Sequence, residues 1–324
     1  MVSQYPRGKI LIVLQLVFSS FLFGVQASSI ASIEIDAGLA ESTFVNVTDI
    51  RGGADPASED SAVQQYLSTL EGDELEFHVQ GWRWHSLSFI RDAGRLEALA
   101  LQLLERGDVT VENGEMLNKA AGHVIDFNLA GLDNVEQSLW FPWLREKLCG
   151  ATSKVREDMR YIMNRTISSV VEERRHISRL ADAVRQQAKL ASSPSVDAEK
   201  RKEAILNVAE MSAALTSRMR SVFDREDRIL VPAVALIIPE REQRALSKKV
   251  IRKLGVLDSR RHLVGMHDAI WEGSDVRERE LFEEEIPYLA RTMIPRWRRL
   301  LYLPAAGMLD GIQPTAPNAR VLLR

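Results

Sequence analysis

The chain has 324 residues, of which 45% are hydrophobic and 27% are charged, and its formal net charge is -3. This length allows one large core or two modest ones, and the near balance of charge gives no reason to expect a nucleic-acid partner. Only 18 glycines and 11 prolines are present, and the composition favours helices over strands. Because Cys149 is the only cysteine, no internal disulfide can form and the core must hold the fold.

The N-terminus has the pattern of a signal peptide. Arg7 and Lys9 precede an uncharged run over residues 10–25, and small residues follow it. We therefore expect residues 1–27 to be cleaved and the mature chain to be secreted or to stay in an endomembrane lumen, with no membrane contact afterwards. The alternative is an uncleaved membrane anchor, for which sixteen residues is a short span.

Residues 28–62 show no sustained hydrophobic period and contain Gly52, Gly53 and Pro56, which is typical of a flexible lead-in. From residue 63 to residue 240 the period is helical. The expected helices begin near Trp82 and then span Glu115–Glu146, Lys154–Ala191 and Asp197–Val231, the last closed by Pro232. Four long helices joined by short breaks predict an all-α, up-and-down four-helix bundle.

Residues 241–312 stay helical but differ in pattern, and they are expected to form an extension packed on the bundle. The expected helices are Arg241–Leu254, Arg260–Trp271 and Arg277–Leu303, the last interrupted at Pro287 and Pro295. Residues 313–324 are expected to be a loose tail.

The bundle region contains an internal repeat. Glu136 and Glu226 lie 90 residues apart, and each is followed six places later by a proline. His85 precedes the first glutamate by 51 residues, and His176 precedes the second by 50. Matched offsets of this kind predict two copies of a helical hairpin that share one inward-facing polar site.

Helical spacing gives a first view of which side chains enter that site. Phe89, Asp92 and Leu96 follow His85 at intervals of 4, 7 and 11 residues, so His85 is expected to face the core. Glu172 and His176 are four residues apart and share a face. Since a buried carboxylate without a partner costs several kcal/mol, inward glutamates require a compensating cation or an arginine.

Histidines and carboxylates that project from facing helices are the usual ligands of metal sites in helix bundles, and they suit iron, manganese or zinc. The candidate metal ligands are His85, Glu136, Glu172, His176, Glu226 and Asp227.

These residues, with the Trp-Phe-Pro-Trp-Leu segment over residues 140–144, resemble the hemerythrin-like (HHE) family over residues 78–236. The resemblance implies a non-haem di-iron centre that binds O2, with ligands at His85, Glu136, Glu172, His176 and either Glu226 or Asp227. The family pattern also has histidines where this chain has Leu132 or Asp133, and Val222 or Phe223. The expected metal site is therefore partly degraded.

A second hypothesis is a metal-free structural or interaction protein that keeps the bundle and satisfies its polar centre with ion pairs and water. In it, His85 is a core histidine bonded to Glu136 or Glu172, and residues 172–175 form a solvated charged face. A third is a metalloenzyme, but the sequence shows no nucleophile with a neighbouring base and no phosphate-binding loop, so enzymatic activity is not expected.

The other histidines are not expected to bind metal. His262 and His267 are five residues apart and do not share a helix face, and His123 is expected at the surface. Protein partners are left open by the sequence.

Overall fold

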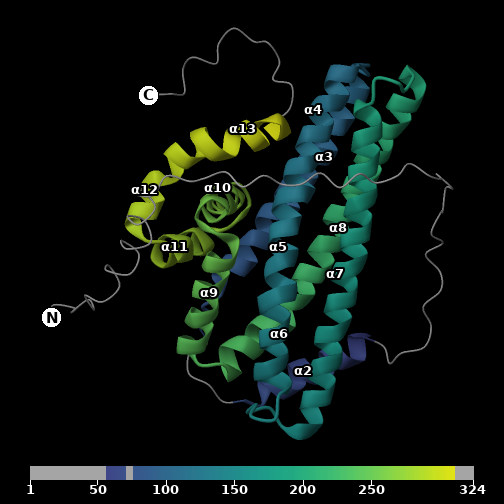
Figure 1. Ribbon diagram of the computed structural model, residues 1–324. Helices are drawn as coiled ribbons and strands as arrows, with labels where there is room; N and C mark the ends of the chain where they lie inside the picture. Colours follow the sequence, from purple (N-terminus) through teal and green to yellow (C-terminus); the bar gives the residue numbers. More distant parts are fainter. Residues whose placement is uncertain (1–55, 71–75, 311–324) are drawn as a thin grey trace. The chain divides into compact units, whose positions relative to one another are not determined.

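A computed structural model describes residues 56–70 and 76–310 of the chain, and among them there are helices and turns but no strand (Figure 1). The predicted all-α class is confirmed. Ala54–Arg324 form one compact unit. The predicted signal peptide and the predicted tail over residues 313–324 lie outside the described residues.

Four long helical runs, called here the central helices, lie side by side. They are α3 (Gln80–Glu105), a run from α4 to η4, α7 (Glu157–Ser192) and α8 (Ala198–Ile237). α3 packs on α8, α8 on α7, and α7 on α4, while α3 also contacts α4 and η2 (Figure 1). Residues 80–149 thus pack against residues 157–237.

The second run alternates between α-helical and π-helical segments. They are α4 (Val111–Ala121), η2 (Gly122–Leu129), α5 (Ala130–Val135), η3 (Glu136–Trp140), α6 (Phe141–Leu144) and η4 (Arg145–Cys149). Thr110 begins the run as an N-cap whose hydroxyl accepts a hydrogen bond from the Asn113 backbone N–H. Pro142 does not end it, and π-helical segments lie on both sides of this proline.

The prediction that Pro232 closes α8 is wrong, because the helix continues to Ile237. Proline removes one backbone donor and crowds the preceding turn. Here Ala233 and Val234 are fully buried in the turn that follows, so packing offsets that cost.

α2 (Pro56–Ser68) begins inside the expected lead-in and packs on α7 and α8. Both oxygens of Asp60 accept hydrogen bonds from the Arg225 guanidinium of α8, at 2.7 and 2.8 Å. The lead-in sequence lacks a strong hydrophobic period, so these partners more than 100 residues away hold the helix in place.

The C-terminal part is helical from residue 240 to residue 310. Its elements are α9 (Glu240–Leu254), α10 (Val256–Gly273), α11 (Val276–Glu285), α12 (Tyr288–Trp297), η5 (Arg298–Tyr302), α13 (Leu303–Ala306) and η6 (Gly307–Asp310). α11 ends before Pro287, as predicted, but α12 continues through Pro295. α10 packs directly on α3, and the Phe282 ring of α11 lies 5.0 Å from that of Trp84 in α3.

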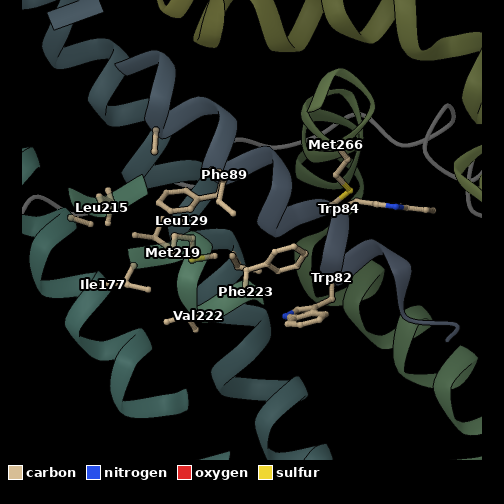
Figure 2. Packing of buried hydrophobic residues seen from close by; sticks show 14 of the residues in the cluster. Trp82, Trp84, Phe89, Leu129, Ile177, Leu215, Met219, Val222, Phe223 and Met266 are labelled. Atoms are coloured by element: carbon tan, nitrogen blue, oxygen red, sulfur yellow. The ribbon is translucent and has the colours of Figure 1, made fainter. Parts of the chain in front are cut away.

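The apolar core runs between the central helices. Figure 2 shows Phe89 of α3, Leu129 of η2, Ile177 of α7 and Met219 of α8 directed toward one another, and all four are buried. The predicted inward stripe of α3, which includes Phe89, Asp92 and Leu96, is confirmed by burial. Among the described residues, no helix is long and apolar enough to cross a membrane.

Candidate functional site: two buried polar clusters

The first buried polar cluster joins the two repeated glutamates through an arginine. Glu136 of η3 and Glu226 of α8 are both almost fully buried, as the repeat predicted. One guanidinium nitrogen of Arg174, in α7, lies 2.8 Å from Glu136 Oε1 and 2.7 Å from Glu226 Oε2. Three central helical runs therefore meet at one ionic triad, Glu136–Arg174–Glu226.

Aromatic and sulfur-containing side chains close around the triad. The Trp82 indole N–H donates a hydrogen bond to Glu136 Oε1 at 3.0 Å, and its ring stacks on Trp140 with centroids 4.8 Å apart. The Arg174 guanidinium also contacts the thioether of Met219. Glu136, Arg174 and Glu226 are all buried, so the triad lies in a region of low dielectric constant.

Burial changes the ionisation of both carboxyl groups. Loss of hydration raises the pKa of Glu136 to about 8 and also raises the pKa of Glu226, against the opposing charge of Arg174. One guanidinium can balance one carboxylate, so we expect the pair to keep one proton near neutral pH. Glu136 Oε2, Glu226 Oε1 and Arg174 Nε have no hydrogen-bond partner among the residues that the structure describes.

The predicted inward orientation of Glu172 and His176 is wrong. Glu172 is exposed and pairs with Arg175 at 2.9 Å, and the side chain of His176 is 31% exposed. Each lies two residues from Arg174, and residues two apart on a helix point about 200° apart. Burying Arg174 therefore turns both away from the centre.

Asp227 also lies outside the triad. Its carboxylate accepts a hydrogen bond from Arg83 Nε of α3 at 2.6 Å and is partly exposed. Leu132, Val222 and Phe223 stand at positions where the family pattern has histidines, and all three are buried in the apolar core.

The second buried polar cluster contains His85, which faces inward as predicted but does not reach the triad through any hydrogen bond. Its ring lies 4.3 Å from that of His262, which comes from α10. Desolvation lowers the pKa of His85 to about 4 and lowers the pKa of His262 well below its usual range. Both Nε2 atoms are buried, and neither has a hydrogen-bond partner within residues 56–70 and 76–310.

The carboxyl group of Asp92 lies at the centre of this second cluster and is fully buried. It accepts hydrogen bonds from Asn128 at 3.1 Å and from the Tyr302 hydroxyl at 3.3 Å, and one ring nitrogen of His123 lies at 3.3 Å. The prediction that His123 lies at the surface is wrong. Arg261 and Tyr302 of the C-terminal helices contact its ring and cover it.

A scan of family models, a search of curated proteins and a search of solved structures each found no match. The resemblance to hemerythrin-like proteins accordingly rests on the sequence motifs.

The six predicted metal ligands do not meet at one place. Among the described residues, no group of three or more histidine, cysteine, aspartate and glutamate side chains is arranged to hold a metal ion. Glu136 and Glu226 meet, but the guanidinium of Arg174 lies between their carboxylates. The residues at the triad thus do not fit the di-iron ligand set that the resemblance implies.

Sequence reasoning missed Arg174, although a signal for it exists. Buried residues of α7 recur every three or four positions, at Met163, Ile167, Val170, Ile177, Ala181 and Val184. Arg174 falls in the gap of that stripe, four residues after Val170 and three before Ile177. An arginine inside an apolar stripe predicts a buried acidic partner.

Proposed function

We propose that this chain is a hemerythrin-like, up-and-down four-helix bundle in which an arginine has replaced the metal. In this proposal it acts as a structural or interaction protein and not as an oxygen carrier or an enzyme. The single observation that supports the proposal is the position of the Arg174 guanidinium between Glu136 and Glu226.

Charge explains why this replacement works. In a carboxylate-bridged metal centre, cations compensate the buried carboxylates. Arg174 supplies one positive charge from within the chain, donates a hydrogen bond to Glu226 and forms an ion pair with Glu136. The raised pKa of Glu136 allows the remaining charge to be neutralised by a proton. The bundle can then keep two inward glutamates without a metal.

Packing supports the same proposal. Val222 and Phe223 place apolar groups where the family pattern has a histidine, and Phe223 contacts the Trp82 ring with centroids 6.2 Å apart. In a protein without a metal, the buried glutamates have only a structural role. Such a protein needs apolar side chains packed closely around them and a cation beside them, because an unpaired buried charge would destabilise the fold.

Metal analysis and melting curves test the proposal. We expect substoichiometric metal in the purified chain, no visible absorption after anaerobic iron addition, and the same melting temperature with and without iron. Glu136→Gln should show the same insensitivity to iron, with the exposed Glu172→Gln as its control.

A metal-binding function is the second candidate, and the convergence of Glu136 and Glu226 favours it. Under it, iron would displace the guanidinium and a small ligand such as O2 could bind. Stoichiometric iron that Glu136→Gln abolishes and Glu172→Gln leaves intact would establish this second candidate and reject the first.

A further inference from the structure

Positive charge is concentrated in one C-terminal segment. Residues 286–309 contain four arginines and no lysine, aspartate or glutamate, although the whole chain has a net charge of -3. The segment covers α12, η5 and α13, and α10 lies between α12 and α3 (Figure 1).

Two of these arginines have no acidic partner in the described part of the chain. Arg291 pairs with Glu283 at 3.3 Å, and Arg298 pairs with Asp268. Arg296 and Arg299 are exposed, and neither forms an ion pair with any residue that the structure describes. Their charges are therefore available to an external anion.

Large apolar side chains lie on the same exposed face. Tyr288 is 75% exposed, Leu300 is 53% exposed, and Leu289 and Leu303 are each 42% exposed. The exposed positions 288, 292, 296, 299 and 303 recur at three or four residues, which places them on one helix face. The opposite face buries Ile294, Trp297 and Tyr302, so the segment is already anchored to the fold on that side.

We propose that the exposed face of α12 to α13, from Tyr288 to Leu303, binds the surface of an anionic phospholipid bilayer. A helix that presents arginines together with leucine and tyrosine fits the interface between headgroups and acyl chains, where arginine reaches phosphate and leucine enters the apolar layer. Each arginine near an anionic surface strengthens binding by roughly five-fold.

Acidic residues near one end of this face decide how it would approach the bilayer. Glu283 and Glu284 of α11 are exposed close in sequence to Tyr288, so we expect the end with Arg296, Arg299 and Leu303 to approach the bilayer most closely.

Vesicle sedimentation tests the proposal with the compact unit Ala54–Arg324, which omits the apolar N-terminal run. We expect it to sediment with phosphatidylcholine vesicles that contain phosphatidylserine and not with phosphatidylcholine alone. The double variant Arg296→Glu, Arg299→Glu should bind at least about 10-fold more weakly, as should Leu300→Ser, Leu303→Ser. Circular dichroism checks that each variant keeps its helices.

Matched variants on other helices separate specific from general effects. Arg218→Glu, Arg220→Glu changes two exposed arginines of α8, and Leu206→Ser changes a leucine that is 42% exposed, like Leu303. These controls should bind as the unchanged chain does. Equal binding to both vesicle types, no binding to either, or equal loss in the α8 controls would overturn the proposal. If the chain does not bind vesicles but binds an acidic protein in a way that requires Arg296, the lipid proposal is also rejected and a protein partner is favoured.

Discussion

At the scale of single residues, the chain shows how one side chain can set the chemistry of a site. Arg174 joins carboxylates that lie 90 residues apart in sequence, one from each half of the repeat. Neither glutamate has another cationic side chain within ion-pair distance among the described residues. The stability of the central helices should therefore depend strongly on this guanidinium.

Replacing Arg174 with methionine should destabilise the fold by about 3–5 kcal/mol, because it leaves two buried carboxyl groups without a cation. Urea unfolding followed by circular dichroism measures this loss. The triple variant with Glu136→Gln and Glu226→Gln added should recover at least half of it, since neutral amides cost less to bury. A triple variant no more stable than the single one would contradict the ionic role.

The buried histidines predict how stability varies with pH. The pKa of His85 is about 4 in the folded chain, below its ordinary value of 6.5, so folding excludes a proton that the unfolded chain takes up. The stabilisation that comes from burying a neutral His85 is fully present above about pH 6.5. It is lost as the pH falls toward about 4, by up to about 1.4 kcal/mol of unfolding free energy per pH unit. His85→Gln should reduce that slope in unfolding curves measured between pH 7 and pH 5, and an unchanged slope would be the contrary result.

At the scale of elements, glycine decides how closely two helices approach. A Cβ built on Gly114 of α4 would lie 2.1 Å from the backbone oxygen of Ala191 in α7. On Gly94 of α3, no atom of the described residues lies within 4 Å of such a Cβ. The α4–α7 contact thus needs glycine at position 114. Position 94 of α3 has room for a side chain.

Gly114→Ala should destabilise the fold by about 1–3 kcal/mol because the backbones must separate. Gly94→Ala, the matched control, should stabilise it by about 0.5–1 kcal/mol, since alanine restricts the unfolded chain and favours helix. Thermal melts of both variants measure the difference. If both variants shift the melting temperature in the same direction, the close approach of α4 and α7 at Gly114 does not limit stability.

At the scale of the whole molecule, the C-terminal helices complete the core and are not a separable addition. The Gln243 side chain of α9 accepts a hydrogen bond from the His78 backbone N–H at 2.8 Å, just before α3. Tyr302 reaches Asp92, and Phe282 covers Trp84. Removing these helices would expose a polar and aromatic face of α3.

A chain that ends at Pro239 should therefore keep much of its helix but melt at a lower temperature and bind a hydrophobic dye. Circular dichroism and dye fluorescence measure these two properties. A truncated chain with the same melting temperature as the full chain would show that the central helices are stable without the extension.

The sequence by itself determined the helical class and much of the inward-facing set. Three- and four-residue spacing predicted the buried stripe of α3, and the matched repeat predicted that Glu136 and Glu226 would both face inward. These features are local, because a helix fixes which side chains share a face once its period is known.

Only the tertiary structure decided which partners these groups have. The sequence predicted that Glu172 and His176 face the polar centre of the bundle, but the apolar stripe of α7 turns Arg174 inward instead. His85 meets His262, 177 residues later in the chain, and not a glutamate. Helical period gives the face of each helix separately, whereas the partner across an interface depends on how the helices pack, and that is set by the sum of many contacts along both of them.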